Sequence, residues 1–139
     1  MRKLSMIYIA ACLISGCTSQ RPFGGAIYIV NSCGKTIYVV ADNFKPWMEP
    51  VGGGDKIFLE LTAAERKVVA VFILAREDQN ITYLFSEKGA DFRVKISDGK
   101  KEKVFNGQEV YRLSENVTSR SDRKHDDVNY EIRSKEICP

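Results

Sequence analysis

The residues of this chain that could carry out chemistry are few, and the first is its only histidine, His125. It lies in the charged segment 123–127 (RKHDD), where Asp126 and Asp127 follow it. A histidine beside an aspartate can act as a general base, and with two carboxylates it can bind a metal ion. The simpler interpretation is a solvated histidine in an exposed loop.

A catalytic triad would also need a nucleophile, and no serine lies in a Gly-x-Ser-x-Gly turn. The sequence likewise contains no phosphate-binding loop, dinucleotide fingerprint or paired-histidine zinc motif. We therefore expect a protein without enzymatic activity, without a cofactor and without a metal site.

A second segment of interest is 43–55 (NFKPWMEPVGGGD), which holds the only tryptophan of the chain. Aromatic, methionine and proline side chains on a loop between strands are typical of protein-binding sites. We therefore expect Phe44, Trp47 and Met48 to contact a protein partner. The alternative is that Phe44 and Trp47 fold back and fill one end of a β-sandwich. The polar segment 115–127 is a second candidate surface.

The N-terminal residues have the layout of a secretory signal peptide. An apolar run follows Met1-Arg2-Lys3 and ends at Ile14-Ser15-Gly16-Cys17. The run is shorter than the roughly 20 residues that cross a bilayer. Its end resembles the lipobox of bacterial lipoproteins, and this resemblance covers residues 1–17. It implies cleavage before Cys17 and attachment of lipid to that cysteine.

The resemblance implies a division of the chain into a cleaved signal peptide (1–16), a tether (17–25) and a β-domain (26–139). Stable anchoring takes more than one acyl chain, because each buried methylene contributes only about 0.8 kcal/mol. Thr18 follows the lipidated position, and in a Gram-negative host this residue favours the outer membrane over the inner one. We therefore expect a lipid-anchored protein of the outer membrane that faces the periplasm.

The cysteines fit the same interpretation. Cys12 leaves with the signal peptide and Cys17 carries lipid, so Cys33 and Cys138 remain as a pair in an oxidising compartment. We predict a Cys33–Cys138 disulfide. The alternatives are a reactive thiol or a metal pair, but a structural zinc site takes four ligands.

The charge of the chain argues against a nucleic-acid partner. The net charge is +3, and removal of Arg2 and Lys3 with the signal peptide brings the mature chain close to neutrality. The lysines at 100, 101 and 103 are typical of a solvated hairpin, and no basic stripe accompanies them.

The mature chain has the pattern of an all-β domain. Residues 26–31 and 36–42 predict a hairpin, and Asp98-Gly99 and Asn106-Gly107 predict the two turns of a three-stranded meander. No segment has the pattern of an amphipathic helix. We expect a small antiparallel β-sandwich or barrel of about eight strands, stapled by one disulfide. The expected strands are 26–31, 36–42, 56–61, 67–75, 81–85, 92–96, 103–105, 109–114 and 128–133, the last running on to Cys138.

These observations predict a non-catalytic lipoprotein whose periplasmic β-domain binds a protein partner, either as an accessory or assembly factor or as an immunity protein. One alternative is a lipid- or glycan-binding domain with a cavity lined by Phe58, Phe72, Phe85 or Phe92. Another is an envelope hydrolase that uses His125.

Overall fold

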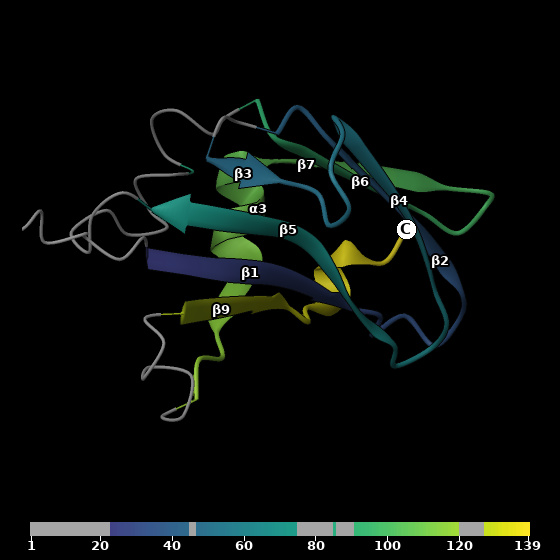
Figure 1. Ribbon diagram of the computed structural model, residues 1–139. Coiled ribbons are helices and arrows are strands. Elements are labelled where there is room, and N and C mark those ends of the chain that lie inside the picture. The colour runs from purple at the N-terminus through teal and green to yellow at the C-terminus, as the bar shows by residue number, and fades with distance from the viewer. Residues whose placement is uncertain (1–22, 45–46, 75–84, 86–90, 120–126) are drawn as a thin grey trace, which may run out of the picture.

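Two β-sheets make up most of the chain that this computed structural model describes, residues 23–44, 47–74, 85, 91–119 and 127–139 (Figure 1). The first sheet has the order β3-β5-β1-β9-β8, and the second has the order β4-β2-β6-β7. The first contains β1 (Phe23–Val30), β3 (Met48–Glu49), β5 (Arg66–Leu74), β8 (Ser114–Asn116) and β9 (Asp127–Ile132). The second contains β2 (Ile37–Asp42), β4 (Lys56–Leu61), β6 (Arg93–Ser97) and β7 (Glu102–Asn106).

The predicted all-β sandwich with one disulfide is confirmed, as an open sandwich rather than a closed barrel. The described strand pairs are antiparallel except one. Strand β1 runs parallel to β9, with Gly25 opposite Val128 and Ile29 opposite Ile132. The first and the last long strands of the described residues therefore lie side by side in the middle of the first sheet (Figure 1).

The predicted hairpin between residues 26–31 and 36–42 is wrong. Strand β1 pairs with β5 and β9, whereas β2 pairs with β4 and β6. The connection 31–36 thus carries the chain from one sheet to the other. Both strands are interior strands with two neighbours each, and a short connection alone does not decide which neighbours they take.

The Asp98-Gly99 turn is confirmed. It lies in the hairpin between β6 and β7, where the Asp98 amide donates to the Lys101 carbonyl at 3.2 Å. Gly99 has a φ of +86°, which lies in the region that favours glycine.

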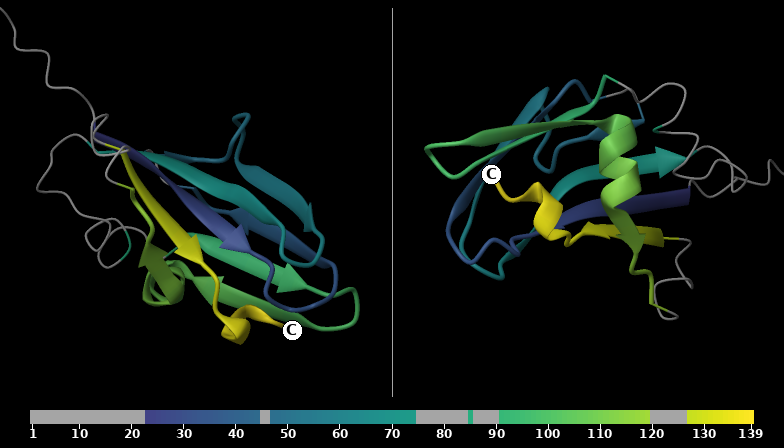
Figure 2. Two further views of the ribbon diagram at one scale, coloured as in Figure 1. Left: turned by 90° about the horizontal axis from the view of Figure 1, so that it is seen from below. Right: turned by 180° about the vertical axis from the view of Figure 1, so that it is seen from behind.

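Asn106-Gly107 begins a helix rather than a turn, so the predicted strand 109–114 is wrong. The helix is α3 (Gly107–Leu113), and the Asn106 side chain accepts a hydrogen bond from the Glu109 amide. The Glu109 carboxylate in turn accepts from the Asn106 amide, and this reciprocal capping box fixes the first turn of the helix. Figures 1 and 2 show α3 crossing from β7 to the first sheet. Val110 and Leu113 of this helix are buried.

The core lies between the sheets and under α3. Its largest buried side chains are Phe72, Phe85 and Phe92. Phe85 is the described residue of the predicted strand 81–85, and the rest of that strand lies outside the described residues.

Strand β1 begins at Phe23, so the end of the predicted tether 17–25 belongs to the first sheet. Gly25 allows close packing there. A Cβ at this position would lie 1.9 Å from the Val128 carbonyl oxygen and 2.4 Å from Cζ of Phe72. The glycine therefore lets β1 approach β9 and lets the Phe72 ring cover the backbone.

Candidate functional site

The outer face of the second sheet carries exposed apolar side chains. Phe58 is 71% exposed, Val104 is 51% exposed and Tyr38 is 46% exposed. The alternation of each strand explains this, because β4 turns Leu61 into the core and Phe58 out to solvent. Large apolar side chains that gather on an exposed face mark interaction sites more often than isolated ones do.

The strand register brings two of these side chains into one row. Across the sheet, Phe58 lies opposite Val40, Val40 opposite Lys95, and Lys95 opposite Val104. We call these four residues the Phe58 row. They line a shallow hollow of about 340 Å³, so this face is concave in addition to carrying apolar side chains.

Three charged residues border the Phe58 row. Arg93 Nε lies 3.1 Å from Asp42 Oδ1, and Lys56 Nζ lies 3.9 Å from Asp42 Oδ2. Lys56 Nζ also lies 5.8 Å from the centre of the Phe58 ring, within the range of a cation–π contact. Two cations on one carboxylate leave this cluster with a net positive charge.

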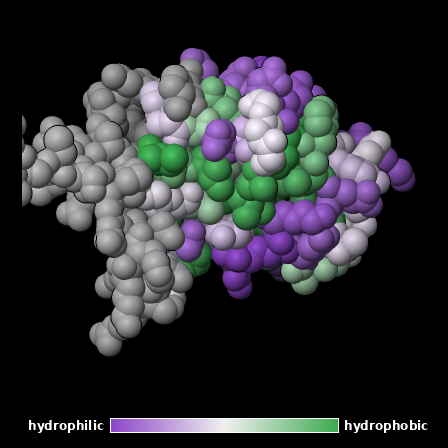
Figure 3. All heavy atoms as spheres, in the orientation of Figure 1, coloured by the Kyte–Doolittle hydropathy of each residue, from purple (hydrophilic) through white to green (hydrophobic). Residues whose placement is uncertain are grey.

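A larger cleft of about 750 Å³ adjoins the hollow and shares Asp42, Lys56 and Arg93 with it. Its far wall is the outer side of β5, where Ile73 is 57% exposed. Figure 3 looks onto the first sheet and shows hydrophobic residues gathered over its middle, above a hydrophilic band. The cleft therefore combines an apolar wall with a charged border.

The segment 43–55 contributes the other wall of the cleft, but the side chains of Phe44 and Met48 turn inward, whereas Val51 is exposed. Met48 is 3% exposed and lies opposite Phe72 in the first sheet. The Phe44 ring meets the Phe92 ring edge-on, with centroids 5.3 Å apart. Met48 is therefore a core residue rather than the exposed anchor that the partner-binding prediction required.

Trp47 is half-buried against the core, and its indole Nε1 is buried with no hydrogen-bond partner among the described residues. Trp47 and Phe44 thus have the packing of the alternative interpretation, in which they fill one end of the sandwich. Both still line the cleft with part of their surface. Their contact with a partner stays a prediction.

The four phenylalanines proposed to line a ligand cavity do not lie together. Phe72, Phe85 and Phe92 are core residues with exposures of 2%, 0% and 0%, whereas Phe58 points to solvent from the opposite side of the second sheet. A ligand pocket in the described part of the chain would be the cleft rather than the core.

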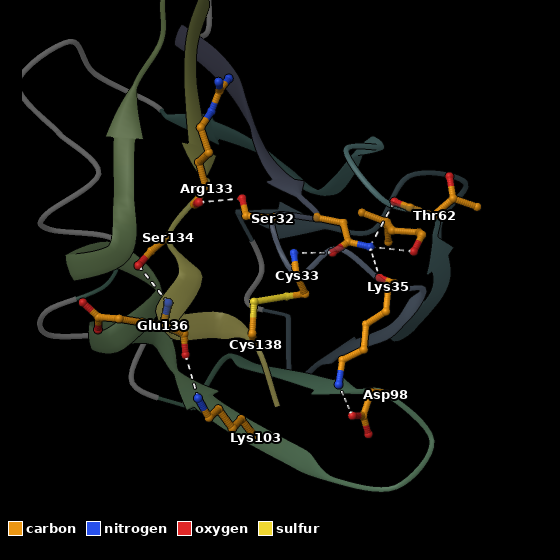
Figure 4. The surroundings of a disulfide bond; sticks show 12 residues. Ser32, Cys33, Lys35, Thr62, Asp98, Lys103, Arg133, Ser134, Glu136 and Cys138 are labelled. Carbon is orange, nitrogen blue, oxygen red and sulfur yellow. Dashed lines mark hydrogen bonds and ion pairs between the residues drawn. A yellow bond between two sulfur atoms is a disulfide. The ribbon is translucent and has the colours of Figure 1, made fainter.

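The predicted Cys33–Cys138 disulfide is present and joins the connection 31–36 to the residue after the short helix η3 (Lys135–Ile137) (Figure 4). The two Cα atoms are 5.4 Å apart and the cysteines are separated by 105 positions in the sequence. Around them, Ser32 Oγ donates to the Arg133 carbonyl at 2.7 Å and Lys103 Nζ donates to the Glu136 carbonyl at 3.0 Å (Figure 4). The disulfide and these hydrogen bonds together fasten the C-terminal segment to the connection 31–36 and to β7.

Asn31 organises the same region and was not predicted. Its side-chain amide donates to the carbonyls of Lys35, Leu61 and Thr62 at 2.7, 2.9 and 3.0 Å. Its side-chain oxygen accepts from the Cys33 amide at 2.9 Å. Asn31 is 1% exposed, so these contacts hold the disulfide loop against the turn between β4 and β5 from inside the protein.

Three carboxylates have a lowered pKa, and all are engaged in structural contacts. The Thr62 amide and the Lys67 side chain lower the pKa of Glu65. The Lys35 side chain, aided by the amides of Lys101 and Lys100, lowers the pKa of Asp98. Burial works to raise the pKa of Glu131, but its contacts with Arg133 and Arg66 outweigh it and the net shift is downward. None of these three carboxylates lies at the cleft or at the Phe58 row.

The structure brings together no group of three histidine, cysteine or carboxylate residues that could hold a metal within the described ranges. His125 and its two aspartates are not all described, because His125 and Asp126 lie outside those ranges, as do Cys17 and the predicted signal peptide. No described helix is long and apolar enough to span a bilayer.

Val104 and Tyr38 are surface residues that were not predicted from the sequence. The available signal was alternation, because Val104 follows Lys101, Glu102 and Lys103 in a strand whose other outward positions are polar. Comparison with protein-family models, curated protein sequences and solved structures finds no match to this chain.

Proposed function

We propose that this chain is a non-catalytic lipoprotein of the bacterial cell envelope whose β-sandwich binds a protein partner. The observation that carries the proposal is the Phe58 row, in which Lys95 lies among three apolar side chains and further charged residues border them on the outer face of the second sheet. Interfaces gain most of their free energy from apolar and aromatic anchors that a polar rim surrounds. The row has this composition.

The charged residues at the Phe58 row indicate which kind of partner surface would bind there. Arg93 and Lys56 share one carboxylate, and Lys95 lies within the row itself with Glu102 at 3.5 Å. A partner surface that offers apolar side chains flanked by carboxylates would match both features. Such a partner fits an accessory or assembly role, and it fits the immunity role equally well.

A photocrosslinking experiment tests the surface. A photoreactive amino acid at Val104 should give one discrete crosslinked species in cells, and Lys95→Glu in the same chain should weaken it. The matched control is Val117, a valine that is 37% exposed and lies outside the second sheet. Crosslinks from Val117 alone, or equal crosslinks from both sites, would contradict the proposed surface.

The membrane anchor is tested separately. We expect a palmitate analogue to label the wild type and not the Cys17→Ala variant, which should accumulate as precursor or as soluble protein. In a Gram-negative host the wild type should fractionate with the outer membrane. Unchanged labelling of the variant would contradict lipidation at Cys17, and inner-membrane recovery would contradict the interpretation of Thr18.

The cleft favours a second candidate, the binding of a small envelope ligand such as a glycan. Its volume of about 750 Å³ lies in the range of ligand pockets. Trp47 is the only tryptophan and lines the cleft, so its fluorescence reports on occupancy. A saturable emission change with a glycan fragment, lost in Arg93→Ala, would support this candidate.

A further inference from the structure

Strand β4 is an edge of the second sheet, and β2 is its only partner among the described strands. Lys56, Phe58 and Glu60 are exposed on its outer face. An edge strand with an exposed aromatic residue and unpaired main-chain groups is a template for a further strand. A strand that pairs with β4 must match both its main-chain groups and its side chains.

The main-chain groups at this edge belong to the same three residues. Lys67 Nζ of β5 donates to the Glu60 carbonyl at 2.6 Å, and β5 belongs to the other sheet. The Glu60 carbonyl therefore points away from β2. Because successive carbonyls of a strand alternate in direction, those of Phe58 and Lys56 also point to the open edge.

The side chains of the edge are self-complementary. Lys56 and Glu60 stand two positions before and two positions after Phe58, on the same face. We propose that β4 pairs with β4 of a second copy of this chain, antiparallel and with Phe58 on the two-fold axis. Lys56 of each copy then lies opposite Glu60 of the other, and the two Phe58 rings lie side by side.

The main chain agrees with this register. The outward groups of Lys56, Phe58 and Glu60 are the ones that an antiparallel partner centred on Phe58 would bond, each pair exchanging both hydrogen bonds. The Lys67 contact leaves the second lone pair of the Glu60 carbonyl available. A parallel partner in register would place lysine beside lysine, so the charges select the antiparallel arrangement.

The two-fold arrangement is complete with two copies of the chain, and it joins their two four-stranded sheets into one continuous sheet. The new outer edges are the β7 strands, where Glu102, Lys103 and Val104 are exposed and α3 follows at once. A single pair of strands is a small interface, so we expect a weak dimer. The inference rests on the edge of β4 and does not depend on lipidation or on the proposed protein partner.

Cysteine crosslinking of the full chain tests the register. The Cα atoms of a hydrogen-bonded antiparallel pair are about 5.5 Å apart, which suits a disulfide. Mild oxidation of Phe58→Cys should give a covalent dimer whose linked peptides both contain position 58. Val104→Cys, a comparably exposed position on β7, is the control and should stay monomeric at that site. No dimer from Phe58→Cys, or an equal yield from Val104→Cys, overturns the proposal.

Charge reversal tests the pairing without a new cysteine. In sedimentation of the full chain in detergent, Lys56→Glu and Glu60→Lys should each raise the dimer dissociation constant at least tenfold. The double variant should recover most of that loss, because each glutamate then faces a lysine again. Recovery also separates the dimer contact from the loss of the Lys56–Asp42 contact, which the double variant does not restore. Single variants that dimerise like the wild type, or a double variant that does not recover, overturn the proposed register.

Discussion

Replacing the amide of Asn31 by a carboxylate should destabilise the protein in a pH-dependent way. Asn31→Asp keeps the oxygen that accepts from the Cys33 amide. It removes the NH₂ group that donates to the carbonyls of Lys35, Leu61 and Thr62, and these oxygens then face a carboxylate. The site is 1% exposed, so water does not replace the lost donors.

The magnitude follows from the buried groups. A buried polar group that loses its partner costs about 1–3 kcal/mol, so Asn31→Ala should lower the free energy of unfolding by about 3 kcal/mol. Asn31→Asp should cost about 4 kcal/mol at pH 7, because it adds an unpaired buried charge. Burial and the three carbonyls should raise the pKa of the new carboxyl in the folded state. The part of the penalty that comes from the charge is therefore absent below the unfolded pKa of about 3.9 and grows as the pH rises toward the folded pKa, whereas the cost of the lost NH₂ donors persists at low pH.

Urea unfolding of the oxidised protein across this pH range is the assay, read as the difference between variant and wild type. The matched control is Asn116→Asp, because Asn116 is exposed and its side chain accepts from the Thr118 amide at 2.9 Å. A carboxylate accepts the same hydrogen bond, so this variant should stay within about 0.5 kcal/mol of the wild type. If Asn31→Asp is as stable as Asn116→Asp at pH 7, Asn31 does not act as a buried donor and the reasoning is refuted.

Four further predictions concern stability. Cys33→Ala should lower the free energy of unfolding by roughly 4–5 kcal/mol in the chain-entropy model for so long a loop, and reduction of the wild type should mimic it in thermal melts. Gly25→Ala should cost about 2–3 kcal/mol in urea unfolding by forcing β1 away from β9, and an unchanged midpoint would contradict their close approach. The pKa of Glu131 is lowered, so its contribution is present above its unfolded pKa of about 4.3 and is lost as the pH falls through the folded value. Glu131→Gln should flatten that acid limb of the stability curve, and an equally steep limb would argue against its two arginine contacts. Trp47→Phe should destabilise far less than Trp47→Ala, since the indole N–H has no partner among the described residues; equal losses in thermal melts would contradict this.

Alternation along the chain was enough to predict several strands. Val94 and Ile96 face the core while Arg93 and Lys95 face solvent, as their spacing indicates. The disulfide followed from the lipobox resemblance, because only Cys33 and Cys138 remain after the signal peptide is assigned. These inferences succeed because a period of two and a count of cysteines are local properties of the sequence.

The helix α3 was missed because its first two residues are also a common turn pair. Asn106-Gly107 starts many hairpins, but Glu109 completes a capping box, and Gly107, Val110 and Leu113 follow at helical spacing. Both patterns fit the segment. Packing of Val110 and Leu113 into the core decides between them.

The candidate site was harder to predict than the fold. Phe58 was assigned to an interior cavity, yet it points to solvent, while Ile57 and Leu59 point inward. Alternation along KIFLEL places Phe58 on the same face as Lys56 and Glu60, and Ile57 and Leu59 on the other face. The charged neighbours of Phe58 therefore indicated the solvent side, and the predicted cavity did not take this signal into account.

Because β1 pairs with β9, the first sheet cannot be completed until the C-terminal part of the chain has been synthesised. Strand β5 becomes available to β1 once the ribosome has made residues up to 74, but β9 requires residues up to 132. Until then one side of β1 has no neighbour in the first sheet, and the bridge from Cys33 has no second cysteine. A growing chain of this protein therefore cannot finish its first sheet from the N-terminus onward. Its longest-lived unfinished edge is the side of β1 that β9 covers last.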